Sequence, residues 1–180
     1  RSLSDLAAMG AEPLFCLVSL ALPSFFRAQW VRAFYRGLFT LADHSGTIVA
    51  GGDLARAATV ICDVMCCGKV PKNGALLRSG ARAGDNIYVT GELGASALGL
   101  ATQRGAAWRR HKRPEPRLAA GLALRSLASA AMDLSDGLSL DLHRLCLESG
   151  VAAQLTGSLP VARGATLDQA GEIGCQATNA

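Results

Sequence analysis

The chain has 180 residues, of which half are apolar and 18% are charged, and its formal net charge is +4. This composition excludes an intrinsically disordered protein, and the length allows one domain or two small ones, each with a modest core. Aromatic residues make up only 5% of the chain, which disfavours a stacking platform for single strands, so we expect no nucleic-acid partner.

Neither the cysteines nor the apolar runs indicate export or a membrane. The six cysteines form no CxxC pair, no histidine stands at zinc-finger spacing, and most cysteines lie in apolar stretches, as buried thiols of a reducing compartment do. No signal-peptide pattern opens the sequence, and the longest uncharged apolar run, residues 14–22, is about half as long as a bilayer requires. We expect a soluble, cytoplasmic protein with no membrane partner.

Strand and helix patterns alternate along the first 72 residues. Residues 4–13 predict a short helix with Ser4 or Asp5 as its N-cap and Gly10 at its end. The further expected elements are a strand at 14–22, a helix at 29–44 with Gly46 at its exit, a short strand at 46–53 that ends in a Gly-Gly-Asp turn, and a strand at 59–70. The strand at 14–22 is apolar on both faces, which indicates that both faces of the sheet are covered.

A second set of elements follows a boundary marked by Pro71, Asn73 and Gly74. The expected elements are a strand at 86–90, a glycine turn and a helix within 91–101, a helix at 116–128, a strand that leads into Asp133, and a helix from 138 towards Gly150. The two sets together predict an α/β or α+β protein whose two subdomains meet near residue 72.

Two stretches could bind anions. Most of the basic excess lies in residues 104–117, RGAAWRRHKRPEPR, where charge alone favours a solvated loop over a phosphate or nucleic-acid patch. Residues 90–99, TGELGASALG, resemble a phosphate loop but lack the full GxGxxG and P-loop patterns, so an ordinary tight turn is favoured.

Three turns place an aspartate beside serine or glycine next to an apolar element. They are LSD at 3–5, GGD at 51–53 and MDLSDG at 132–137. Glycine and serine let the backbone approach a bulky anion and offer donors to it, while carboxylates suit Mg²⁺, which prefers oxygen ligands and often bridges substrate phosphates. The three turns therefore indicate a magnesium and phosphate site.

Helix capping is the alternative explanation of these aspartates. An N-cap accounts for Asp5 or Asp136 taken alone. It does not account for Asp133, which lies three residues before Asp136, and two carboxylates so close repel each other unless a cation or a proton intervenes. From the residues alone, a metal site and structural caps both remain open.

The motifs as an ordered set resemble a known family. LSDLAAMGAEP, GGD, LLRSGARAGDNIYVTGELGASALGL, RHKRPEPR and AMDLSDGLSLDL occur in this order between residues 3 and 163. Together they are similar to the thiamine-monophosphate kinase family of the aminoimidazole ribonucleotide synthetase-like superfamily.

This resemblance implies a two-domain fold, α/β plus α+β, that is incomplete at both ends of this sequence. Residues 1–72 would be the remainder of an N-terminal α/β domain that binds ATP and Mg²⁺ and dimerises. Residues 73–180 would be the first part of a C-terminal α+β domain. The implied partners are ATP and thiamine monophosphate, and a second copy of the chain in a homodimer.

The implied activity is ATP-dependent phosphorylation of thiamine monophosphate to thiamine diphosphate, by direct in-line transfer assisted by several Mg²⁺ ions. We expect weak or no activity from these 180 residues alone, because part of the family's metal cage has no counterpart in them. The residues that hold the thiamine moiety are unknown.

Matched position by position, the resemblance assigns seven residues of this chain. The Mg²⁺ ligands would be Asp5, Asp53, Asp133 and Asp136, and the ATP contacts would be Gly52, Asp53, Arg78 and Ser135. Apart from the groups that hold the metal, no catalytic residue is implied.

One departure keeps two other functions open. After GGD the family usually continues Thr-Thr-Arg-Gly, whereas this chain reads Leu-Ala-Arg-Ala at 54–57 and so lacks both hydroxyls. A superfamily enzyme that acts on a different phosphate acceptor is one alternative. A non-catalytic remnant of the fold is the other, although retention of the four aspartates argues against it.

Overall fold

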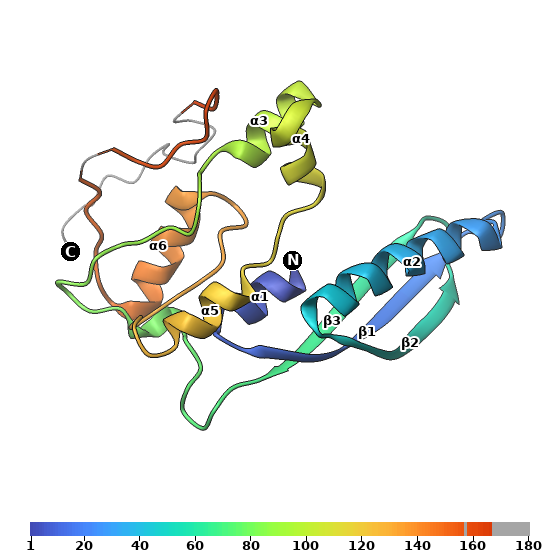
Figure 1. The fold of residues 1–180 in the computed structure, drawn as a ribbon, viewed down its shortest axis with the longest axis horizontal. Helices are drawn as coiled ribbons and strands as arrows, with labels where there is room; N and C mark the ends of the chain where they lie inside the picture. Colours follow the sequence, from blue (N-terminus) through green and yellow to red (C-terminus); the bar gives the residue numbers. More distant parts are fainter. Residues whose placement is uncertain (157, 167–180) are drawn as a thin grey trace.

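The computed structural model describes residues 1–156 and 158–166, and it contains a three-stranded sheet and six α-helices within them. The sheet and one long helix form one end of the molecule, and the helices that follow the sheet in the chain form the other (Figure 1). The last residues of the expected C-terminal part, 167–180, lie outside the described residues.

The sheet is mixed, with the order β2-β1-β3. The central strand β1 (Glu12–Leu22) pairs in parallel with β2 (Ile48–Arg56) and antiparallel with β3 (Ile61–Lys69). Helix α2 (Ala28–Ser45) makes the crossover between the parallel strands, and Gly46 ends it in the left-handed conformation, with φ of 67°. The expected strands at 14–22 and 59–70 and the expected helix at 29–44 are thus confirmed.

Only one face of the sheet is covered by the described residues. Cys16, Val18, Leu20 and Leu22 of β1 alternate with less buried neighbours and are all under 9% exposed. On the opposite face, Ile48, Ile61 and Met65 pair in register with Phe15, Ala21 and Leu17, and the first three are 67%, 55% and 45% exposed. We call these six residues the open face. The expectation that both faces are covered is wrong for this chain by itself, because apolar alternation shows that a face avoids water but not what covers it.

The Gly-Gly-Asp motif lies inside β2 and forms no turn, which corrects the sequence prediction. Its register against β1 shifts where Cys16 pairs with Val49 and Leu17 pairs with Gly51, so Ala50 is the extra residue of a bulge. A Cβ on Gly52 would lie 1.9 Å from the carbonyl oxygen of Val18. The glycine is therefore needed for the close approach of two strands.

Helices dominate the rest of the described chain. The elements after β3 are the 3₁₀ helix η1 (Arg78–Gly80) and the α-helices α3 (Ala95–Thr102), α4 (Gly105–Lys112), α5 (Leu118–Leu124) and α6 (Leu138–Ser149). The expected helices after the glycine turn and after Asp136 are confirmed, and α5 covers the central part of the expected helix at 116–128. The basic segment, expected as a loop, contains α4.

The strands expected at 86–90 and before Asp133 do not form. Among the described residues of this half, the only bridge joins Leu93 to Val161, with hydrogen bonds on either side from the Leu93 N–H to Pro160 and from the Ala162 N–H to Leu93. A strand requires a neighbour for its backbone hydrogen bonds, and no other extended segment of the described chain forms a ladder with 86–90.

Helix α1 (Ser2–Ala8) joins the two ends of the molecule. Its Leu3 and Leu6 form a buried cluster with Ala11, against which Cys66 of β3 and Leu118 of α5 pack. Arg1 occupies the N-cap position and no side chain caps the helix, so the expected caps at Ser4 and Asp5 are wrong, whereas Gly10 does end the turn with φ of 65°. Contacts between α1 and α5 cross the expected domain boundary at 72, which itself stays a prediction.

No helix in the described part of the chain combines the length and the apolar character that a membrane crossing requires.

Candidate active site

Asp5 and Asp133, predicted from separate motifs, are neighbours in the structure. Asp5 lies on α1, and Asp133 lies in the segment that leads into α6. Burial raises the pKa of the Asp133 carboxyl above its usual value, and the negative charge of Asp5 raises that pKa further, while a hydrogen bond from Ser4 opposes both effects. Two carboxylates held together in this way form a donor set suited to a hard divalent cation.

The loop between Asp133 and α6 is held by a residue that the sequence analysis missed. Asp141, on the first turn of α6, has no exposed surface. Its Oδ2 accepts the backbone N–H groups of Ser135 and Asp136, both at 2.9 Å, and its Oδ1 accepts Nη1 of Arg144 at 3.1 Å. Asp141 therefore fixes the backbone that carries two of the predicted site residues.

A signal for Asp141 exists in the sequence. Leu138, Leu142 and Leu145 recur at helical spacing, and Asp141 falls on the same stripe of α6. A carboxylate on a stripe that faces the core must find donors there, because an unpaired buried charge is costly. The donors turn out to be the two loop N–H groups and Arg144.

Asp136 is not a helix cap. Gly137 takes the N-cap position of α6 without a side-chain hydrogen bond, and the Asp136 carboxylate instead accepts Nη1 of Arg144 at 2.5 Å. The Arg144 guanidinium thus joins Asp136 to Asp141. In this arrangement the Asp136 carboxylate is partnered by a cation of the protein itself.

Gly52 and Asp53 lie elsewhere, on β2. Asp53 pairs with Ser19, which is exposed, and its Oδ1 accepts the N–H of Leu54 at 2.9 Å. The two residues line an open pocket of about 360 Å³, to which Tyr35 and Phe39 of α2 also contribute. No three acidic, histidine or cysteine side chains within residues 1–156 and 158–166 gather closely enough to hold a metal ion, so Asp53 is not brought to the Asp5–Asp133 pair.

Arg78 begins η1, which packs against α6. Its carbonyl accepts the hydroxyl of Ser149, and the same hydroxyl accepts the N–H of Ala81. Arg78 and Ser135 are both exposed, and both are anchored to α6, at its C-terminal and N-terminal ends respectively. Helix α6 is thus the common support of two predicted ATP contacts.

Known proteins resemble this chain in sequence and in fold. A family model described as AIR synthase related protein, N-terminal domain, matches residues 1–70. The thiamine-monophosphate kinase of Salmonella typhimurium is 42% identical over 165 residues, which is 86% of this chain and 50% of that protein, and the Bacillus subtilis enzyme is 36% identical over 172 residues, 88% of this chain and 53% of that one. The chain spans about half the length of the curated relatives it matches.

Solved structures of thiamine-monophosphate kinases also match the fold of this chain. The thiamine-monophosphate kinase of Stenotrophomonas maltophilia K279a matches 93% of this chain and 59% of its own, with a TM-score of 0.84 and 38% identity. AaThiL complexed with AMPPCP and TMP matches 82% of this chain and 50% of its own, with a TM-score of 0.76 and 31% identity.

The α/β fold with its mixed sheet resembles that of the AIR synthase-related superfamily, whose N-terminal-domain model matches residues 1–70. Within the superfamily its relatives are the thiamine-monophosphate kinases, so the resemblance and the fold class inferred from the motifs are both confirmed.

Proposed function

We propose that the chain belongs to an ATP-dependent kinase that converts thiamine monophosphate to thiamine diphosphate. The observation that carries the proposal is the pairing of Asp5 with Asp133, because two motifs 128 positions apart bring like charges together beside a serine hydroxyl. The relatives bear the name of this enzyme, and one of them has been solved with an ATP analogue and TMP. In the proposed reaction a phosphate oxygen of thiamine monophosphate attacks the γ-phosphorus of ATP in line, the bond to the β–γ bridging oxygen breaks, and ADP leaves.

Asp5 and Asp133 are the residues of this chain best arranged to hold Mg²⁺, and Asp53 and Asp136 are the further proposed ligands. Mg²⁺, when bound, would neutralise phosphate charge and align the reacting groups. The protein's own part is to position: Asp141 fixes the loop of Ser135 and Asp136, and α6 supports Arg78 through Ser149. Arg78 would contact phosphate of the nucleotide, since its guanidinium is exposed and always charged.

We further propose a cytoplasmic homodimer. The open face of the sheet supports the dimer, because a contiguous exposed apolar surface on a folded protein usually marks an interaction site. The described cysteines form no disulfide, in keeping with a reducing compartment.

Calorimetric titration with ATP, with and without Mg²⁺, tests the nucleotide site. We expect Mg²⁺-dependent binding that Asp133→Asn weakens about tenfold or more, while the exposed Glu148→Gln on α6 leaves it unchanged. ATP binding that is unaffected by Mg²⁺ and by Asp133→Asn would contradict the proposal. No ATP binding by a folded chain would favour the interpretation as a non-catalytic remnant.

An assay of thiamine diphosphate formation tests the reaction. Because only two of the four predicted aspartates are gathered in this chain, we expect slow turnover from the chain by itself. Consumption of ATP with another phosphate acceptor, and none with thiamine monophosphate, would instead identify a different enzyme of the superfamily.

A further inference from the structure

The positive charge of the molecule is concentrated around α4. Residues 104–117 contain six lysines and arginines and one acidic residue, so their formal charge of +5 exceeds the +4 of the whole chain. The four aspartates and Arg78 of the proposed active site make no use of this segment. This segment follows the Gly-rich stretch at 90–99 closely in the chain, and the sequence left both stretches open as anion-binding candidates.

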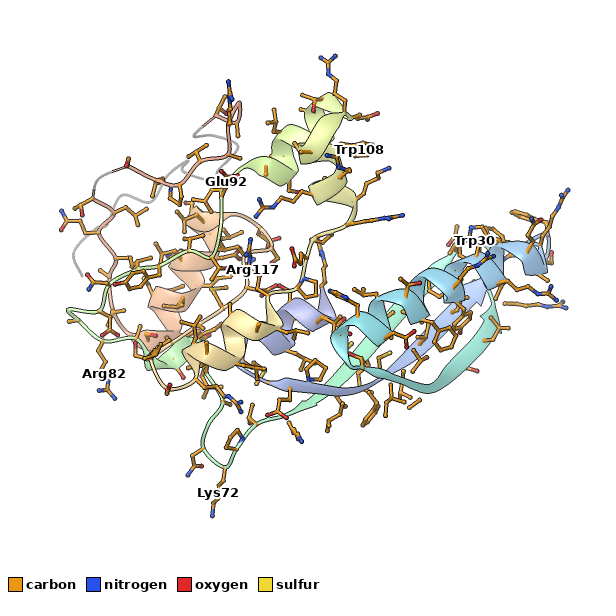
Figure 2. All side chains as sticks on the ribbon, viewed as in Figure 1. Trp30, Lys72, Arg82, Glu92, Trp108 and Arg117 are labelled. Carbon is orange, nitrogen blue, oxygen red and sulfur yellow. The ribbon has the colours of Figure 1, made fainter. Side chains whose placement is uncertain are left out.

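Two arginines of this segment converge on Gly91. A Cβ built on Gly91 would lie 2.6 Å from Nη2 of Arg117 and 3.0 Å from Nη2 of Arg110. The two guanidinium groups therefore reach the same point from different parts of the chain. Arg110 lies on α4, and Arg117 is the N-cap residue of α5. We call the space between Gly91 and these two groups the Gly91 notch; Arg117 and Glu92, the residue after Gly91, are labelled in Figure 2.

The charge in the notch is only partly balanced. Arg110 reaches Oε2 of Glu92 at 3.9 Å, a long ion pair between half-exposed side chains. In residues 1–156 and 158–166, Arg117 pairs with no carboxylate. Two guanidinium groups, of which only one pairs with a distant carboxylate, leave a net positive charge at a single point, which suits an anion.

Glycine is what keeps the notch open. Gly91 has φ of 101°, a conformation that other residues rarely adopt, and any side chain would meet the two Nη2 atoms. The backbone thus leaves room where the two arginine side chains meet.

We propose that the Gly91 notch binds the phosphate group of a small organic phosphate. A compact tetrahedral anion can accept N–H groups from both guanidinium forks at once, which a single carboxylate does less well. The proposed binding requires no metal.

Nucleic acid fits the same surface less well. The aromatic ring nearest to the basic residues in sequence, Trp108, already stacks on His111, with centroids 5.4 Å apart and planes 10° apart, and the Lys112 ammonium lies 4.8 Å from its centroid. Binding of single strands relies on open aromatic faces for the bases, and these contacts occupy the ring.

Titration of the full chain with inorganic phosphate and with pyrophosphate, without Mg²⁺ and at about 0.15 M salt, tests the proposal. We expect Arg110→Ala and Arg117→Ala each to weaken pyrophosphate binding about tenfold, and Arg109→Ala, the matched loss of charge next to Arg110 on α4, to change it less than about twofold. Arg117→Lys keeps the charge but loses the fork, so we expect it to behave like Arg117→Ala. Omitting Mg²⁺ keeps this result independent of the proposed nucleotide site.

Gly91→Ala is the sharpest variant, because it fills the notch without changing the charge. We expect it to weaken pyrophosphate binding, because the two guanidinium tips must move apart to admit the methyl group, while circular dichroism shows the helices intact; if the strained backbone unfolds it, the arginine variants decide. Equal weakening by Arg109→Ala and Arg117→Ala would overturn the proposal, since charge alone would then account for binding. Tight binding of a single-stranded oligonucleotide with none of pyrophosphate would overturn it in favour of nucleic acid.

Discussion

Asp141 has no exposed surface and accepts three hydrogen bonds, two from loop N–H groups and one from Arg144. Asp141→Ala leaves two loop N–H groups without their acceptor and Arg144 with Asp136 alone, so we expect a loss of about 3 kcal/mol in the free energy of unfolding. Asp141→Asn keeps one carbonyl oxygen and should lose less. Urea denaturation measures both, with the exposed Glu148→Ala on the same helix as control; equal stability of Asp141→Ala and Glu148→Ala would contradict this role.

Because of Cys66, we expect the free energy of unfolding to vary with pH in the alkaline range. Burial raises the pKa of the Cys66 thiol above the usual 9.0, and the facing Cys16 raises it further. Burial also raises the pKa of Cys16. A thiol whose pKa is higher in the folded state contributes stability that is fully present below about pH 9 and is lost as pH rises through the folded value.

We therefore expect Cys66→Ala to unfold with a shallower loss of stability between about pH 9 and pH 11 than the unchanged chain. Denaturation midpoints across this range measure it. Cys67→Ala is the matched control, because Cys67 pairs with Phe15 and so points to the other face of the sheet. An unchanged pH slope in Cys66→Ala would show that the thiol pair does not contribute.

Sequence patterns located the candidate residues better than they located their partners. Asp5 and Asp133 were both predicted, since unusual carboxylates at the edge of apolar elements stand out. That Asp133 faces Asp5 while Asp53 lies apart on β2 depends on how distant segments pack, which spacing does not encode. The position of Asp141 on the apolar stripe of α6 is a signal in the sequence, but two of its three donors are backbone N–H groups of the loop, and these leave no mark there.

Two glycines in helices have opposite roles at the scale of the element. Gly121 lets α5 approach α1, and a Cβ there would lie 1.9 Å from the carbonyl oxygen of Ala7. Gly37 lies on the exposed side of α2 with nothing within 4 Å.

Alanine at each position should therefore change stability in opposite directions. We expect Gly121→Ala to lower the free energy of unfolding by about 1–3 kcal/mol through overpacking, and Gly37→Ala to raise it by about 0.5–1 kcal/mol through its better helix propensity. Thermal denaturation of the two variants measures the pair. A stabilising Gly121→Ala would mean that α1 and α5 are not in close contact.

Elements with their own periodic signal were predictable, and elements that depend on a neighbour were not. Strand β1 and helices α2 and α6 carry clear patterns, so their positions were correct within a few residues. Residues 86–90 have strand-like composition but no ladder partner among the described residues, and the Gly-Gly-Asp stretch was mistaken for a turn because its glycines serve a bulge.

The open face is the feature that decides the state of the whole molecule. If it is the dimer surface, a charge at its centre should separate the copies, because burying an unpaired carboxylate is costly. We expect the unchanged chain to sediment as a dimer and Met65→Glu to sediment as a monomer with unaltered helix content.

Leu147→Glu is the control for this measurement. Leu147 is 67% exposed, more than the 45% of Met65, but lies on α6, away from the sheet. A monomeric unchanged chain, or a dimer that Leu147→Glu disrupts as strongly as Met65→Glu, would rule out the open face as the contact.

The contacts of α1 with both ends of the molecule also affect the order in which the chain can fold during synthesis. All three strands and α2 lie between residues 12 and 69, so the sheet can pair as soon as Lys69 has left the ribosome. Helix α1 is synthesised before any of them, yet Leu118 and Gly121, which cover it, follow about fifty residues after the sheet is complete. Helix α1 is therefore made before the sheet but fully covered only after it, and Asp5 reaches Asp133 only after most of the described chain has emerged.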